Sequence, residues 1–409
     1  MRLVNFHRLK FELERVSNMS PSVLLEKVAL KLFGILLGVL LLPISTILHL
    51  LGYRHVTVFT DRIGHLALEP DCLLKEVALG LIPSRKWILL APPRRISNDH
   101  LLTYWKPHFL IIDSNLGSFL ISNMSRFGLM RHDVSHYARV EGKARESFHV
   151  YSKWGMRGPL LTLSKEDSNW GLAELQKLGL PEGKWFVCIH SREGGYSPID
   201  EKIHAHRNGD IESLIPAIKD IVSKGGWVIR LGDRSMRPLP PIINVIDYAH
   251  HPLKSPRLDI FLCASCKFFL GSTSGICLVS NLFGIPAAIA NMVPVADLWY
   301  GPRDISIPKR LWSETFNRYL TLQESIEYPY GCFAYPSQYT DANLKLIDNT
   351  PEDITELAIE MMDRLSANQF SLPEDTLTRA FYKTHWDQRF ASFESCAHLG
   401  VYFFGKYFK

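Results

Sequence analysis

The sequence of 409 residues predicts an α/β fold in which two Rossmann-like parallel sheets face each other across a cleft. From Arg54 onward, short runs rich in β-branched residues alternate with helical stretches, which is typical of parallel β-α-β units. This pattern weakens after about Ala138, and the stretch from Gly155 to Leu180 is expected to be loop and helix that bridge two domains. Hydrophobic residues make up 46% of the chain and charged residues 21%, a balance that excludes a disordered or fibrous protein.

Four parts follow from this pattern along the chain. A basic and apolar N-terminal segment precedes a first sheet domain, and a second sheet domain comes next. Helices at the C-terminus are expected to pack back across the domains. The expected boundaries of the four parts are 1–53, 54–165, 166–345 and 346–409.

The strands are predicted from apolar runs that end at turn residues. In the first domain we expect strands at 55–60, 87–91 and 108–113, with helices at 65–81 and 115–127. In the second domain we expect strands at 184–190, 226–232, 243–249, 267–271 and 286–291, with helices at 211–224, 258–264 and 274–284. Ligands of parallel sheets bind outside the carboxyl ends of the strands, so the residues that follow each strand are the candidate site.

The N-terminal segment contains a membrane candidate. Residues 32–51 are twenty positions without a charge, which is the length of a spanning helix, and six basic residues against three acidic ones precede them. Pro43 interrupts the run, and a strand is expected directly after it. A helix in the cytoplasmic leaflet or a kinked hairpin is favoured, with residues 22–51 on the membrane surface. A single span and a buried core helix are the alternatives.

Net charge and cysteine content argue against a nucleic-acid-binding protein and against a disulfide-bonded protein. The net charge of +5 is too small to indicate a nucleic-acid partner. Seven cysteines, an odd number that falls mostly within apolar runs, favour a reducing compartment over a disulfide framework. The pair Cys263 and Cys266 forms a lone CxxC pattern without further ligands, so we interpret both as buried small hydrophobes and expect no metal.

Anion-binding residue types follow the strands of the second domain. Arg192 and Glu193 follow His190 at the end of one strand, with a glycine pair after them, and Arg207 stands shortly before a helix. Arginine is a bidentate donor and glycine lets backbone N–H groups approach, so both segments suit a phosphate. Polar turns without a ligand are the alternative interpretation.

A third strand end is rich in hydroxyl groups. It consists of Ser272, Thr273, Ser274 and Gly275 before an apolar helix, a cradle suited to a diphosphate. The spacing is neither that of a Walker loop nor that of a dinucleotide fingerprint. Arg230 and Asp233 stand at a neighbouring strand end and are further candidates for binding the donor phosphate, so several Arg, Gly and hydroxyl groups are expected at one sheet edge.

In the first domain, Arg62, Gly64 and His65 follow the first strand and are expected on the acceptor side, a solvated turn being the alternative. The candidates for a general base are Glu193, Asp200, His190 and His65, and geometry has to decide among them. Serine-elbow, HExxH and DxD patterns are absent from the sequence.

The stretch 185–291 resembles a family of bacterial glycosyltransferases from surface-polysaccharide loci. The segments that carry the resemblance are FVCIHSREGG, AHRNGD, GWVIRLGDRSM and FFLGSTSGICLVSNLFGIPAAIAN. The early VTVFTDRIGHLALEPD is similar to the first strand turn of heptosyltransferases. His190-x-Arg192 is distantly similar to a fucosyltransferase pattern. That pattern has paired arginines, whereas Glu193 follows Arg192 here, so GDP-fucose is not the expected donor.

The resemblance implies a GT-B fold and a metal-independent enzyme that moves a sugar from a nucleotide-sugar co-substrate to a glycan or glycolipid acceptor. It implies that Arg192 and Arg207 bind the diphosphate, that Ser272 to Gly275 form its cradle, and that Arg62 to His65 line the acceptor side. No further cofactor is implied, and the place of action would be the cytoplasmic face of the inner membrane. A sugar-nucleotide epimerase and a non-catalytic binding component of a polysaccharide assembly complex are the alternatives. The sequence specifies no oligomeric state.

Overall fold

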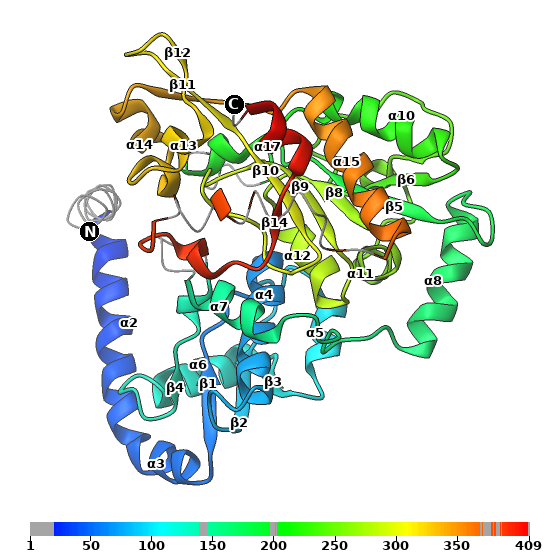
Figure 1. The fold of residues 1–409 in the computed structure, drawn as a ribbon. Helices are drawn as coiled ribbons and strands as arrows, with labels where there is room; N and C mark the ends of the chain where they lie inside the picture. The colour runs from blue at the N-terminus through cyan, green and yellow to red at the C-terminus, as the bar shows by residue number, and fades with distance from the viewer. Residues whose placement is uncertain are drawn as a thin grey trace. The chain divides into compact units, whose positions relative to one another are not determined.

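The computed structural model describes residues 20–138, 145–196, 201, 203–368, 370, 378, 380–381, 385 and 387–407 (Figure 1). The described chain forms two compact units. Unit 1 contains the residues up to Asp61, Pro83–Ile96 and Trp105–Ser135. Unit 2 contains Arg62–Ile82, Ser97–Tyr104 and the residues from His136 on, so the chain passes repeatedly between the units.

Unit 1 is built around a parallel four-stranded sheet with the order β3-β2-β1-β4. Its strands are β1 (Tyr53–Val56), β2 (Lys86–Leu90), β3 (Phe109–Ile112) and β4 (Arg131–His132). The three predicted strands are present, although β1 ends at Val56, earlier than expected. The helix α6 (Asn115–Met124) covers the sheet through Met124, which packs with Ile88 of β2.

The apolar run at the start of the chain forms two helices in place of one. α2 (Pro21–Leu40) ends before Pro43, and α3 (Leu42–Leu50) has this proline in its first turn, where a missing N–H breaks no helical hydrogen bond. The two helix axes are bent by 57°. Among the described helices, none alone is long and apolar enough to cross a membrane, whereas the bent pair α2 and α3 together is.

Unit 2 contains a seven-stranded parallel sheet with the order β14-β10-β9-β8-β5-β6-β7. The five predicted strands are β5 (Phe186–His190), β6 (Trp227–Arg230), β7 (Val245–Ile246), β8 (Phe269–Gly271) and β9 (Ala287–Met292). Two strands that the sequence pattern did not predict extend the sheet, namely β10 (Ile305–Pro308) and β14 (His398–Leu399). Two parallel sheets in one chain confirm the predicted α/β class.

Most of the described α-helices belong to unit 2. They are α4 (Ile63–Ala78), α5 (Asp99–Trp105), α7 (Arg145–Trp154), α8 (Lys165–Lys177), α10 (Ile215–Ser223), α11 (Pro256–Ser265), α12 (Gly275–Leu282), α15 (Pro351–Ser366) and α17 (Val401–Tyr407). A small antiparallel sheet has the order β12-β11-β13, with β11 (Arg310–Ser313), β12 (Arg318–Tyr319) and β13 (Leu344–Ile347). The short helices α13 (Leu322–Ile326) and α14 (Pro336–Asp341) accompany it.

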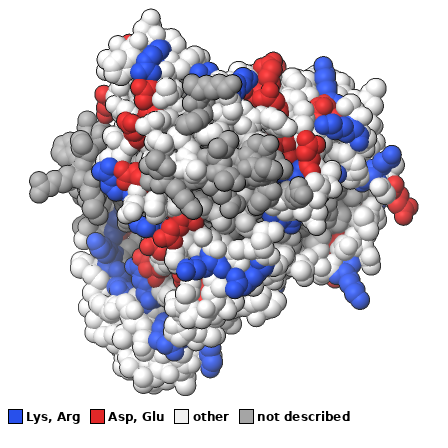
Figure 2. Space-filling model, in the orientation of Figure 1, with Lys and Arg blue, Asp and Glu red and all other residues white. Residues whose placement is uncertain are grey.

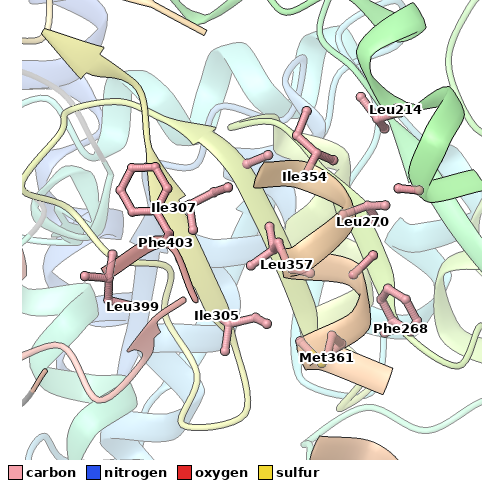
Figure 3. Packing of buried hydrophobic residues seen from close by; sticks show 14 of the residues in the cluster. Leu214, Phe268, Leu270, Ile305, Ile307, Ile354, Leu357, Met361, Leu399 and Phe403 are labelled. Carbon is pink, nitrogen blue, oxygen red and sulfur yellow. The ribbon is translucent and has the colours of Figure 1, made fainter. Parts of the chain in front are cut away.

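The core of unit 2 lies between α15 and the sheet (Figure 3). Ile354, Leu357 and Met361 of α15 recur at helical spacing and are at most 2% exposed. They pack with sheet residues that include Leu270 and Ile305. Each such side chain contributes roughly 1.5–3 kcal/mol by leaving water, so this face holds α15 on the sheet.

All seven cysteines are free thiols, and Cys263 and Cys266 are buried. Burial raises the pKa of the Cys263 thiol well above its usual value. The prediction that this CxxC pair consists of buried small hydrophobes is therefore confirmed. Within the described ranges, no group of three His, Cys, Asp or Glu side chains is placed to hold a metal ion.

Candidate functional site

The carboxyl ends of β5, β6 and β8 lie side by side, as the sequence predicted. His190 at the end of β5 pairs with Gly271 at the end of β8, and Ile189 pairs with Arg230 of β6. A Cβ atom at Gly271 would lie 2.4 Å from the carbonyl oxygen of His190. Only glycine fits this approach, which lets the Ser272 N–H donate to that carbonyl and begins the hydroxyl-rich loop at the sheet edge.

Arg192 and Arg207 tie the loop at 203–209 to the sheet edge. The guanidinium of Arg192 donates to the carbonyl of His204 at 3.1 Å and to Asn208 Oδ1, and it lies 3.6 Å from Glu201. Arg207 Nη2 donates to the carbonyl of Thr273 at 2.8 Å. Both predicted phosphate ligands therefore lie at this edge, and both already order the loop that surrounds it.

The side chains of Ser272 and Thr273 are buried and bonded within the protein. Ser272 Oγ accepts from the Arg192 N–H at 2.8 Å, and Thr273 Oγ1 accepts from the Val293 N–H at 3.3 Å. These hydroxyls shape the loop. Ser274 and Gly275 are half-buried and lead into the first turn of α12.

The N-terminus of α12 meets the N-terminus of α4 (Figure 1). A Cβ atom at Gly64 would lie 2.9 Å from the Cα of Gly275, and one at Gly275 would lie 2.8 Å from the Gly64 nitrogen. The structure therefore joins the predicted acceptor-side turn to the predicted phosphate cradle. Arg62 is the exposed N-cap residue of α4.

Neither helix neutralises its own positive end. The N-cap side chains, Arg62 and Ser274, make no capping hydrogen bond, and neither first turn contains an acidic residue. Each helix N-terminus carries roughly half a positive charge, and two of them in contact repel each other. An anion bound at this point would relieve the repulsion, because helix N-termini attract negative charge.

Further cations lie near this edge. Lys309 is buried, donates to the carbonyl of Asn208 at 2.7 Å and pairs with Asp348 at 2.7 Å. Burial, together with the nearby positive charges of Arg207, Lys309 and Arg192, lowers the pKa of His206 to about 3. Several cationic side chains therefore gather around the loop at 203–209.

His65 forms a dyad with an acidic residue one turn later on α4. Its Nδ1 lies 2.6 Å from Glu69 Oε1, and Glu69 is fully buried. A buried carboxylate at this distance fixes the orientation of an imidazole ring. The sequence interpretation named His65 but missed Glu69, although their i,i+4 spacing on a predicted helix was a usable signal. Lys309 and His206 had no such signal.

The other candidates for a base are placed differently. His190 is buried, its Nδ1 bonds the carbonyl of Leu231 at 3.1 Å, and burial lowers its pKa to about 4. Glu193 Oε2 accepts from the Arg237 N–H at 2.8 Å, and its Oε1 lies 3.4 Å from Arg230. Asp200 lies outside the described residues.

Arg230 and Asp233 support the loop after β6. Arg230 is fully buried and donates to Asp247 at 3.0 Å and to the carbonyl of Arg237 at 3.0 Å. Asp233 accepts from the Ser235 N–H at 2.8 Å and so closes a turn. In this structure both side chains hold protein groups, whereas the sequence interpretation placed them on a phosphate.

No protein-family model and no curated protein sequence matches the chain. Solved structures that resemble it are glycosyltransferases of low sequence identity. A glycosyltransferase family 9 protein from Veillonella parvula is 14% identical, covers 75% of this chain over 80% of its own and has a TM-score of 0.36. Heptosyltransferase II of E. coli is 12% identical, and the match covers 76% of this chain and 99% of that protein with a TM-score of 0.38. The iron-containing dodecameric heptosyltransferase TibC, in complex with ADP-D-β-D-heptose, is 12% identical. The match covers 77% of this chain and 77% of that protein, with a TM-score of 0.43.

All these TM-scores lie below 0.5.

Proposed function

We propose that this protein is a GT-B glycosyltransferase that moves a sugar from a nucleotide-sugar donor to a glycan or glycolipid acceptor. The observation that carries the proposal is the contact of two unneutralised helix N-termini at Gly64 and Gly275. They adjoin a hydroxyl-rich strand end and a loop ordered by Arg192 and Arg207. A diphosphate is the anion whose size and charge suit two helix ends and adjacent arginines.

The proposed reaction forms one bond and breaks one. The acceptor hydroxyl oxygen bonds to the anomeric carbon of the donor sugar, and the bond from that carbon to the diphosphate oxygen breaks. The leaving nucleoside diphosphate gains the negative charge that the helix ends, Arg192 and Arg207 stabilise. These groups do so by fixed positive charge, which is the basis for proposing transfer without a metal.

His65 is the proposed acceptor of the hydroxyl proton. It stands in the first turn of α4, directly after Gly64, and therefore next to the proposed phosphate site. Glu69 is a positioning residue, because its buried carboxylate binds Nδ1 of His65 and stabilises the imidazolium that forms. The protein contacts of His190 and Glu193 make His65 the preferred base.

The proposed class of acceptor is inferred from the apolar N-terminal helices α2 and α3. A growing glycan carried on a lipid, at the cytoplasmic face of the inner membrane, would be presented to a protein held there by residues 22–51. The apolar character of α2 and α3 supports this part of the proposal.

The test is a thermal-shift screen of the full chain in EDTA against ADP, UDP, GDP, CDP, CMP and dTDP and the corresponding sugar nucleotides. We expect one nucleotide class to stabilise the protein, and we expect Arg207→Met to weaken that ligand's affinity by about tenfold or more, since it removes a charged donor. Arg318→Met is the matched control, because Arg318 is half-exposed and pairs with Glu324 elsewhere in unit 2. An absence of any shift, or equal affinity in Arg207→Met, would contradict the proposed donor site.

A further inference from the structure

Unit 1 exposes an extensive apolar surface that the proposed sugar transfer does not use. Eleven large apolar side chains of α2 are more than a third exposed, and Leu25, Leu36 and Leu40 are each exposed by 70% or more. Ile44, Ile47 and Leu50 of α3 continue the surface. Soluble proteins rarely expose a contiguous apolar surface of this extent, so it indicates an interaction site.

The surface extends beyond the apolar run that the sequence singled out. α2 contacts α6 at Gly34 and Gly38, where a Cβ atom at Gly38 would lie 3.0 Å from the carbonyl oxygen of Asn123. The rings of Phe33 and Phe119 stack with centroids 6.3 Å apart. Helix α2 is therefore fixed to the sheet domain of unit 1.

Exposed apolar residues of the sheet domain adjoin this contact. Leu116 is 69% exposed, and it lies one turn before Phe119 on the same face of α6. Phe127 is 46% exposed, and its ring lies 3.0 Å from a Cβ built at Gly38. Leu129 is 36% exposed, and its carbonyl bonds His49 of α3. Two separate parts of the sequence thus form one apolar surface.

The second half of this segment lacks a polar face. The charged residues of α2, namely Glu26, Lys27 and Lys31, all precede Leu32, and none occurs from Leu32 to Leu51. A helix that lies in the headgroup layer keeps one polar face, whereas a helix that is apolar all round is surrounded by apolar material. Here those side chains are exposed, so the apolar material is outside the described protein. Figure 2 shows few charged side chains over the lower part of α2 and over α3.

The length and bend of the pair limit how deep it reaches. The uncharged part of the pair consists of nine residues of α2, 32–40, and the nine residues of α3. On the two sides of the 57° bend they give arms of ~13.5 Å that together span ~24 Å, less than the ~30 Å of a hydrocarbon core. The strand β1 begins at Tyr53, two residues after Leu51, so no stem separates the helices from the sheet. This geometry favours entry from one side without crossing.

Cations border the apolar surface. Lys31 is exposed and lies one turn before Gly34, and a Cβ at Gly34 would lie 2.5 Å from Nη2 of the exposed Arg126. Positive groups beside an inserting apolar surface attract anionic lipid headgroups. This charge pattern distinguishes a lipid partner from a second copy of the chain, which would bring the same cations to the same surface.

We propose that unit 1 inserts into one leaflet of an anionic bilayer through a surface formed jointly by α2, α3 and α6. Leu116 and Phe127 are part of the lipid contact, and Lys31 and Arg126 contact the headgroups. The inference deepens the proposed membrane association. Its test does not depend on sugar transfer, because nucleotide binding is measured separately on the same samples.

The experiment is flotation of the full chain, diluted from detergent into vesicles of phosphatidylcholine with and without phosphatidylglycerol. We expect it to float with both vesicles and more strongly with phosphatidylglycerol. The double variant Leu116→Ser and Phe127→Ser should bind at least about tenfold more weakly, since two exposed apolar side chains lose their burial in lipid. Arg126→Gln should reduce the preference for phosphatidylglycerol.

The matched control is Leu172→Ser with Ile243→Ser, two apolar residues of unit 2 that are 56% and 82% exposed. This variant should float like the unchanged chain. Failure of the chain to float with either vesicle would overturn the proposal. Unchanged flotation of the double variant would remove Leu116 and Phe127 from the surface. Light scattering that shows a dimer, lost in the same double variant, would assign the surface to a second copy.

Discussion

The contact between Gly64 and Gly275 can be tested by adding a single methyl group. In Gly275→Ala the new Cβ would lie 2.8 Å from the Gly64 nitrogen and 3.0 Å from the Gly64 Cα, which are main-chain atoms in the first turn of α4. An ordinary contact begins at 3.4 Å, so the two helix ends must separate by 3.4 − 2.8, about 0.6 Å. No side chain can rotate away to make this room.

Stability and binding should respond to different degrees. Overpacking of this kind costs roughly 1–3 kcal/mol, and up to ~1 kcal/mol of it is offset because alanine favours a helix over glycine. Misplacement of a site by ~1 Å can lower activity by as much as 10²-fold. We therefore expect a fall of roughly 1–2 kcal/mol in the free energy of unfolding and a nucleotide affinity at least about tenfold weaker.

The assay is chemical unfolding together with titration of the nucleotide class that stabilises the unchanged protein. Gly405→Ala in α17 is the control, because a Cβ there would meet no atom within 4 Å. It should leave both quantities unchanged or raise stability slightly. If Gly275→Ala bound the nucleotide as tightly as the unchanged protein, the helix ends would not be the phosphate site.

Two further predictions concern histidines. Glu69→Gln keeps an acceptor for His65 Nδ1 but removes the charge, so kcat should fall with KM for the donor little changed, by less than the roughly 10²–10⁴-fold expected for His65→Ala. An unchanged kcat in Glu69→Gln would contradict a positioning role for Glu69. The variant His190→Asn tests how stability depends on pH. Burial lowers the pKa of His190 from 6.5 to about 4. The contribution of His190 to the free energy of unfolding is therefore present above pH 6.5 and is lost as the pH falls through 4. Asparagine keeps a donor for the Leu231 carbonyl but does not titrate. Between pH 6.5 and 4 the free energy of unfolding of the variant should therefore fall less than that of the unchanged protein, by up to about 3 kcal/mol. An equally steep fall would contradict this prediction.

The buried strands of unit 2 could be predicted because each is a local apolar run. The pattern placed β5, β6, β8 and β9 within a few residues of their observed bounds. It missed β10 and β14, and β14 has only two residues, too few for any periodic signal. Its pairing of His398 with Ile305 joins positions more than ninety residues apart, and such a pairing depends on packing.

The candidate site divides in the same way. Arg192, Arg207 and the residues from Ser272 to Gly275 were identified from their positions after predicted strands, because the carboxyl ends of parallel strands meet at one edge. The interpretation of Arg230 as a phosphate ligand could not foresee its ion pairs with Glu193 and Asp247, which come from other loops.

Residue types and local periodicity in the sequence by itself determined the α/β class, the strand ends that carry arginine, glycine and hydroxyl groups, and the uncharged run from Leu32 to Leu51. Only the tertiary structure decided that Gly64 lies against Gly275, and that Leu116 of α6 and Phe127 after it continue the apolar surface of α2. The first set depends on the order of neighbouring residues. The second depends on close packing between segments as much as two hundred residues apart, which a linear pattern does not encode.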